Sequence, residues 1–108
     1  MEETFTREIA RCSEFDVSVE DHGALTMYGS FEYDGGGQGL GYVIDAQFIK
    51  NFLGVFRVSR LRQVTGRYCW VTHSHSSIIK LEPVLPNDGT EFDIAAWVAV
   101  LKASRGKG

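Results

Sequence analysis

Apolar and polar residues alternate along the first third of the chain, which is the pattern of β-strands that bury one face. The apolar positions are Phe15, Val17 and Val19 in one segment and Leu25, Met27, Phe31 and Tyr33 in the next. Residues 20–23 contain Asp and Gly, which accept the backbone angles of a tight turn. The pattern therefore predicts two strands joined as a hairpin. Gly29 interrupts the apolar face of the second strand and indicates a bulge or a close approach of another group.

Five glycines fall within seven residues directly after the second predicted strand. Their density predicts a loop over Asp34–Gln38, because glycine accepts backbone conformations that other residues avoid. Leu40, Tyr42 and Ile44 then alternate with other residues and predict a short third strand.

The strongest helical pattern in the chain follows Asp45. Apolar side chains recur on one side at helical spacing, at Phe48, Ile49, Phe52, Leu53 and Phe56. Asp45 is a suitable N-cap, because its carboxylate can accept hydrogen bonds from free backbone N–H groups at the helix start. Gly54 within this helix indicates close packing at that position.

The second half of the chain predicts a short helix, two strands and a last helix. Ser59 is the predicted cap of the short helix at Arg60–Thr65. Residues with high β-propensity predict strands at Tyr68–Thr72 and Ile78–Leu85. The last helix is predicted to begin after Asp93, which would cap it.

The order of these elements predicts the fold class. Short turns between consecutive strands favour antiparallel pairing. We therefore predict a single α+β domain over residues 1–108, with an antiparallel sheet of about four or five strands. One main helix covers the sheet, and a short helix and a C-terminal helix complete the domain. The composition, 44% hydrophobic and 23% charged, is that of a globular protein.

No segment of the sequence indicates a membrane or secreted protein. No apolar run approaches the roughly 20 residues that a membrane-spanning helix needs. The acidic N-terminus lacks the basic and apolar regions of a secretion signal, so we expect a cytoplasmic protein. Cys12 and Cys69 are too few for a disulfide framework and are expected to be reduced and buried.

Charge is distributed unevenly although the net charge is only −3. Residues 1–45 carry ten acidic and two basic side chains, whereas residues 46–81 carry six basic and no acidic ones. Such asymmetry fits a bipolar surface that docks a partner. It fits equally well two blocks that face each other inside the fold.

The glycine-rich segment is the first candidate site, since the backbone N–H groups of such a loop can bind a phosphate or a carboxylate. The dinucleotide fingerprint is absent, because Gly37, Gly39 and Gly41 are spaced by two and a strand follows instead of a helix. A hairpin loop, a partner-contact loop and a phosphate cradle are the open alternatives.

Arg57, Arg60, Arg62 and Arg67 form a basic cluster between the main predicted helix and the strand after it. An alternative function is a small-ligand module that uses the glycine loop and Arg57, Arg60 or Arg62 to bind a nucleotide. Beside Tyr68 and Trp70 the basic cluster could also contact a nucleic acid backbone and stack a base. The pI of about 5.5 argues against direct nucleic-acid binding.

His73 and His75 are the candidate metal ligands, but a metal site needs three or four ligands and no further one has a suitable spacing. We expect no metal and no cofactor, and two imidazoles in a turn that respond to pH near about 6.5. Cys69 with His73 is the one local cue for a nucleophile. Because their side chains lie well apart in a strand, a thiol enzyme is not expected. Glu20, Glu32 and Asp34 could neighbour each other across the hairpin as a carboxylate pair of the glycosidase kind, but solvated acids are the ordinary explanation, and we expect no enzyme.

Three stretches resemble a group of small phage and prophage proteins. They are residues 20–26, residues 33–42 with the sequence Tyr-Asp-Gly-Gly-Gly-Gln-Gly-Leu-Gly-Tyr, and residues 48–56. The group is largely uncharacterised. The resemblance implies a phage protein made inside a bacterial cell, where small acidic proteins of this kind include inhibitors of host defence such as anti-CRISPR proteins.

This context leads to a functional hypothesis. The chain is a non-enzymatic binding protein that inhibits a host protein or ribonucleoprotein complex, such as a CRISPR–Cas effector, by occupying a surface on it. An acidic patch can occupy a groove that normally holds nucleic acid. The predicted partner-binding residues are Glu20, Asp21, Glu32, Asp34, Gly35, Gly36, Gly37 and Gln38. A homodimer formed by pairing an exposed strand edge is a third alternative.

Overall fold

The computed structural model describes residues 4–19, 23–34, 36–74 and 77–106. These residues form an α+β fold with one antiparallel sheet of six strands, in the order β3-β2-β1-β4-β5-β6. The strands are β1 (Thr6–Val19), β2 (Leu25–Tyr33), β3 (Gly36–Val43), β4 (Tyr68–His73), β5 (Ile78–Pro83) and β6 (Phe92–Asp93). The helices are α1 (Ala46–Phe56), α2 (Ile94–Gly106) and two short 3₁₀ helices, η2 (Leu61–Gln63) and η3 (Pro86–Asp88). The predicted class and the antiparallel sheet are confirmed, and the unpredicted strand is the short β6.

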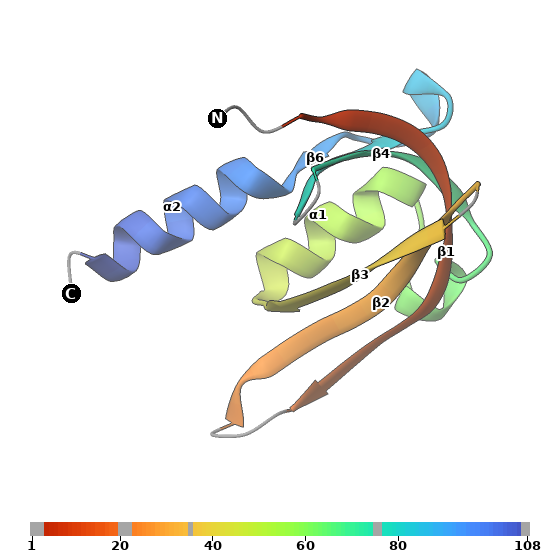
Figure 1. Ribbon diagram of the computed structural model, residues 1–108. Coiled ribbons are helices and arrows are strands. Elements are labelled where there is room, and N and C mark those ends of the chain that lie inside the picture. Colours follow the sequence, from red (N-terminus) through yellow and green to blue (C-terminus); the bar gives the residue numbers. More distant parts are fainter. Residues whose placement is uncertain (1–3, 20–22, 35, 75–76, 107–108) are drawn as a thin grey trace.

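The sheet is strongly curved and wraps around α1 (Figure 1). It therefore has an inner face toward α1 and an outer face on the opposite side. Phe48, Phe52 and Phe56 of α1 are buried in the core that fills the inner face. The carboxylate of Asp45 accepts a hydrogen bond from the N–H of Phe48 at 2.9 Å, which confirms the predicted N-cap.

Strand β1 changes its buried face in the middle. Ala10 and Cys12 are buried before the change and Phe15 after it, so the buried positions shift from even to odd numbers. In the pairing with β2, Glu14 and Phe15 together face the single residue Gly29, which is a β-bulge. A Cβ atom at Gly29 would lie only 2.4 Å from the Phe15 ring. The close approach predicted at Gly29 is confirmed.

The predicted loop Asp34–Gln38 is wrong in its second half. Strand β3 begins at Gly36, so the last three residues of that range pair with β2. The connection is limited to Asp34 and to Gly35, which lies outside the described residues. Hydrogen bonds to β2 hold the glycine-rich backbone extended and outweigh the preference of glycine for turns.

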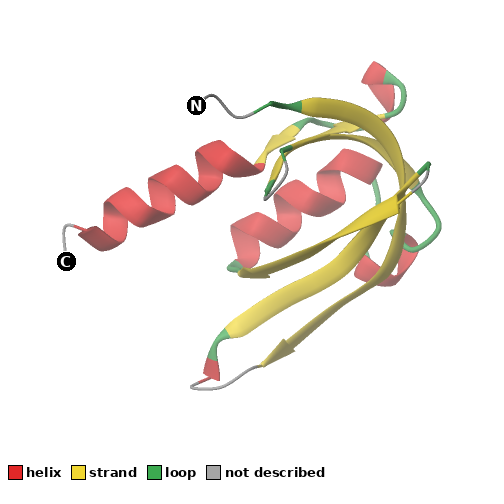
Figure 2. Ribbon diagram, in the orientation of Figure 1, coloured by secondary structure: helices red, strands yellow, loops and turns green. Residues whose placement is uncertain are grey.

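The short helix is also shorter than the predicted Arg60–Thr65, because only the turn η2 forms there. The Gln63 side chain accepts hydrogen bonds from the N–H groups of Ser59 and Arg60, at 3.1 Å and 2.9 Å, so Gln63 and not Ser59 supplies the cap. The predicted cap of the last helix is confirmed. The Asp93 carboxylate accepts from the N–H of Ala96 at 2.9 Å, and α2 extends from there beyond the sheet (Figure 2).

The two cysteines lie beside each other in the core. Cys12 and Cys69 are both buried and free, as predicted. A hydrogen bond between the two side chains, together with burial, raises the pKa of the Cys12 thiol. Both thiols therefore act as small apolar core residues.

Candidate functional site

The outer face of the β1–β2 hairpin carries acidic side chains. Residues opposite the buried positions of a strand point away from the core. Glu14 and Asp16 of β1 and Tyr28 and Glu32 of β2 are exposed on this side. We call these four residues the acidic outer face. Their neighbours on this face are Arg11, which lies opposite Glu32, and small residues, namely Ser13, Ser30, Gly37, Gly39 and Gly41.

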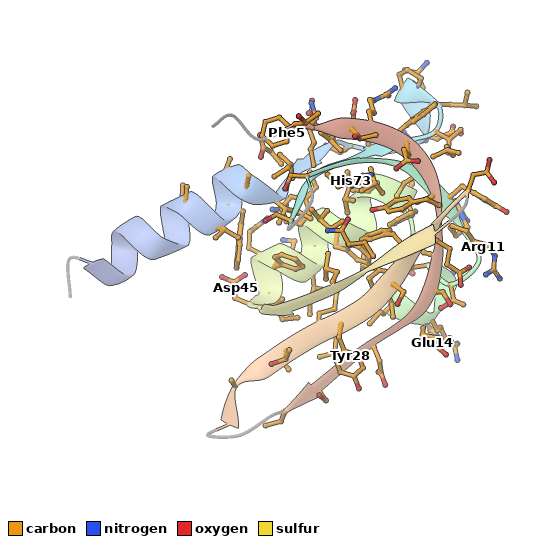
Figure 3. All side chains as sticks on the ribbon, viewed as in Figure 1. Phe5, Arg11, Glu14, Tyr28, Asp45 and His73 are labelled. Atoms are coloured by element: carbon orange, nitrogen blue, oxygen red, sulfur yellow. The ribbon has the colours of Figure 1, made fainter. Side chains whose placement is uncertain are left out.

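A hollow of about 500 Å³ opens in this surface at the β-bulge. Its lining consists of Glu14, Phe15, Asp16, Tyr28, Gly29 and Ser30, of which Figure 3 labels Glu14 and Tyr28. Gly29 itself faces the core, where the Phe15 ring fills the space that a side chain would occupy. The hollow therefore coincides with the β-bulge, where the regular pairing of the hairpin is interrupted.

The carboxylates of this face are available to a partner. Among the described residues, Glu14 and Asp16 make no ion pair, and Asp16 accepts only from the N–H of Val17 at 2.8 Å. Glu32 accepts from the Arg11 guanidinium at 3.0 Å, with each side chain about half exposed. Exposed pairs of this kind contribute at most about 1 kcal/mol, so a partner can compete for Glu32.

The structure places some of the predicted partner-binding residues together and separates others. Glu20, Asp21 and Gly35 lie outside the described residues. Glu32 and Gly37, which pair across β2 and β3, share the outer face, and Asp34 is exposed at the turn. Gln38 faces the other way, because it pairs with the buried Phe31.

Sequence reasoning missed Glu14, Asp16 and Tyr28 as contact residues. The alternation in β1 already placed both acids opposite the apolar positions, so their exposure was readable from the sequence. The hollow could not be predicted from the sequence. It requires the bulge at Glu14 to lie opposite Gly29, and this depends on the register between two strands.

A second polar group lies on the inner face, where β1, β2, β3 and β4 run side by side. His73 Nε2 lies 2.6 Å from Glu8 Oε2, and the Tyr33 ring stacks on the His73 ring with a centroid distance of 4.5 Å. The Tyr33 hydroxyl donates to Gln38 Oε1 at 3.2 Å. Burial and the Glu8 carboxylate raise the pKa of Tyr33. Because these side chains bind one another, we interpret the group as a link between strands.

His73 and His75 are the two side chains that the sequence offers as metal ligands, although no metal was expected. His75 lies outside the described residues. Within the described ranges, no group of three or more His, Cys, Asp or Glu side chains is arranged to hold a metal ion.

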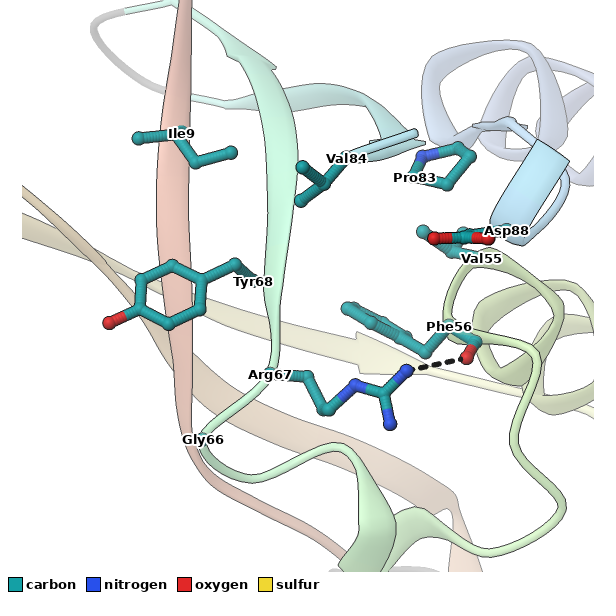
Figure 4. Close-up of a pocket in the computed structure, with 9 residues that line it drawn as sticks. All are labelled: Ile9, Val55, Phe56, Gly66, Arg67, Tyr68, Pro83, Val84 and Asp88. Carbon is teal, nitrogen blue, oxygen red and sulfur yellow. Dashed lines mark hydrogen bonds between the residues drawn. The ribbon is translucent and has the colours of Figure 1, made fainter. Parts of the chain in front are cut away.

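Another hollow, of about 430 Å³, is mainly apolar and lies between the sheet and the end of α1 (Figure 4). Its lining includes Ile9, Phe56, Tyr68 and Val84. The guanidinium of Arg67 donates to the carbonyl of Phe56 at 3.2 Å. Arg67 therefore binds a free carbonyl at the C-terminus of α1, which is a structural role for one side chain of the basic block.

Arg57, Arg60 and Arg62 are exposed on the connection between α1 and β4 and make no ion pair with other described residues. Neither hollow is lined by one of them together with a glycine of β3. Extended β3 also directs successive N–H groups to opposite sides, unlike the converging groups of a phosphate cradle. The nucleotide module stays a prediction that this geometry does not favour.

The part of the chain that the structure describes has no helix of the length and apolarity needed to cross a membrane. Comparison of the chain with protein-family models, curated proteins and solved structures finds no match.

Proposed function

We propose that this chain is a non-enzymatic binding protein of phage or prophage type, which inhibits a host defence complex by occupying a protein surface on it. The acidic outer face is the contact surface. A protein groove that holds nucleic acid, such as that of a CRISPR–Cas effector, is lined by basic side chains. An acidic surface is complementary to such a groove in charge.

The observation that carries this proposal is the position of Tyr28 beside the acidic hollow. Tyr28 is 40% exposed, although it belongs to a central region of the sheet. Exposed aromatic residues supply a large contact area and are enriched among the residues that dominate binding energy. The surrounding carboxylates add long-range attraction to a basic partner.

The backbone at Glu14 supports the same surface. Its φ of 57° lies in the left-handed region, which costs a residue other than glycine about 1–2 kcal/mol. Bulges often serve to redirect a side chain near a functional site. Here the bulge turns an acidic side chain toward the hollow.

An affinity pull-down tests the proposal. The tagged full chain is incubated with lysate from a bacterium that expresses a CRISPR–Cas system, with and without nuclease treatment. We expect a stoichiometric protein band that survives nuclease, and loss of interference activity when the chain is added to the purified complex. If nothing is retained, or only material that nuclease removes, the proposed function is wrong.

A further inference from the structure

Strand β3 is an edge strand, since it pairs with β2 on one side and with no other described strand. The N–H of Ile44 donates to the carbonyl of Leu25 at 2.9 Å, so these two residues form a hydrogen-bonded pair. Hydrogen-bonded and non-hydrogen-bonded pairs alternate along an antiparallel ladder. Counting back from Ile44 in the observed register, Gly37, Gly39 and Gly41 direct their N–H and C=O groups away from β2.

The free edge of β3 therefore presents the backbone of glycines. All three are exposed, and a Cβ atom at Gly41 would meet nothing within 4 Å. On the outer face, no side chain of these residues stands between the edge and an approaching strand. The backbone groups of these glycines can therefore bind an approaching strand, and no glycine side chain obstructs it.

The other sheet edges carry the usual protection against pairing. Strand β6 has two residues, one of which is Asp93, and continues directly into α2. The second half of β1, beyond its pairing with β4, carries the bulge at Glu14 and the charge of Asp16. Charges, bulges and short length all discourage edge pairing. Strand β3 has none of these, because Gly36–Val43 contains no charged residue, no proline and no break in register.

We propose that β3 pairs antiparallel with β3 of a second copy of this chain, with Gly39 at the two-fold axis. In this register Gly39 faces Gly39 of the second copy, and Gly37 faces Gly41. The identical strands bring no like charges opposite each other, and no side chains on the outer face keep them apart. A two-fold interface uses the same edge of both copies, so assembly stops at a dimer.

The dimer extends the sheet through both copies and places two acidic outer faces on one continuous surface. It is independent of the proposed function, because the pairing uses backbone groups of β3 and none of the acidic side chains. A negative pull-down therefore does not contradict the dimer, and a monomeric chain does not contradict the proposed function.

The test measures the mass of the purified full chain by light scattering over a dilution series, for wild type and for variants at one position. Gly39→Pro removes an outward N–H without touching the ladder to β2. Gly39→Lys places like charges opposite each other at the axis. Asn87→Lys, on the exposed turn η3, is the matched control for added charge. Thermal unfolding of each variant checks that the fold is retained.

We expect wild type and the Asn87→Lys variant each to form a homodimer. The dissociation constant of the dimer should be at least about tenfold higher in both Gly39 variants, which is equivalent to about 1.4 kcal/mol. High salt should partly restore the dimer of Gly39→Lys but not that of Gly39→Pro, since salt screens charge repulsion. The amides of Gly37, Gly39 and Gly41 should exchange slowly in the dimer and rapidly in Gly39→Pro.

A wild-type chain that stays monomeric at its highest soluble concentration overturns the proposal. The free edge of β3 would then be available to a strand of another protein instead. A dimer that both Gly39 variants retain, while folded, places the interface elsewhere and equally overturns it.

Discussion

At the scale of single residues, the glycine that packing requires is Gly89 and not Gly54. A Cβ atom at Gly89 would lie 2.0 Å from the carbonyl oxygen of Val55, whereas one at Gly54 would meet nothing within 4 Å. The turn at Gly89 does pack closely on Gly54, because the N–H of Thr90 donates to the Gly54 carbonyl at 2.9 Å, but this contact does not require residue 54 to be glycine. A glycine in a helix is visible in a sequence, but the approach of a distant turn to the end of α1 is not.

Gly89→Ala is expected to destabilise the fold by about 1–3 kcal/mol, because the new methyl group overlaps the Val55 carbonyl and the turn must shift. Gly54→Ala is expected to stabilise it by about 0.5–1 kcal/mol through helix propensity. Urea unfolding of both variants measures the difference. Equal effects of the two substitutions would contradict the packing described at Gly89.

The raised pKa of Tyr33 predicts how the free energy of unfolding changes at alkaline pH. Its raised pKa means that the folded chain keeps the proton at a pH where the unfolded chain, with a tyrosine pKa of about 10, releases it. The contribution of Tyr33 to stability is therefore retained below about pH 10 and falls as the pH rises beyond it. The raised pKa of the Cys12 thiol acts in the same direction.

Tyr33→Phe should remove the Tyr33 part of this loss, while the part due to Cys12 cancels in the comparison with wild type. At neutral pH the variant should be about 1 kcal/mol less stable, because the hydrogen bond to Gln38 is lost. Urea unfolding between about pH 8 and about pH 11 measures both effects. If the variant lost as much stability as wild type over this range, the alkaline loss of stability would come from another group and not from Tyr33.

At the scale of elements, the sequence predicts α1, α2 and most strands, because each is encoded by residues that lie close together along the chain. The phenylalanine spacing and Asp45 predicted α1 within its observed bounds, and alternation predicted the β1–β2 hairpin. Strand β3 was predicted too short because pairing with β2, and not the glycines themselves, decides its conformation. The two residues of β6 carry no periodic signal and form a strand only through pairing with β5.

The cap of α1 predicts a specific substitution pattern at Asp45. Asp45→Ala should cost about 1 kcal/mol, since the N–H of Phe48 loses its acceptor, whereas Asp45→Asn should cost much less because its amide oxygen can accept the same bond. Thermal unfolding of the two variants and wild type measures the order. If Asn were as destabilising as Ala, the hydrogen bond would not be the source of the effect.

At the scale of the whole molecule, the opposed charge blocks remain largely unpaired in the part of the chain that the structure describes. Its ion pairs join Arg7 to Glu82, Arg11 to Glu32 and Lys80 to Glu91, and Glu8 contacts His73. None of them joins an acidic residue of the first block to an arginine or lysine of residues 46–81. Of the two interpretations of the asymmetric charge, this pattern favours a bipolar surface.

The sequence placed acidic residues on the outer face but did not locate the site. Glu32 follows from alternation in β2, while the hollow at Tyr28 depends on the pairing of Glu14 and Phe15 with Gly29. The free edge of β3 likewise depends on strand order. Both features arise from contacts between segments that are distant in sequence, and no local pattern encodes them.

The most direct test of the account compares the affinity of the captured host complex for wild type, for the double variant Glu14→Lys with Asp16→Lys, and for Tyr28→Ala. Glu91→Lys, an exposed charge reversal beyond β5, is the matched control. We predict that the double variant and Tyr28→Ala each bind at least about tenfold more weakly, equivalent to about 1.4 kcal/mol, while Glu91→Lys binds like wild type and all the variants stay folded. Unchanged affinity of the double variant and of Tyr28→Ala would contradict the account, because the acidic outer face would then not be the contact surface.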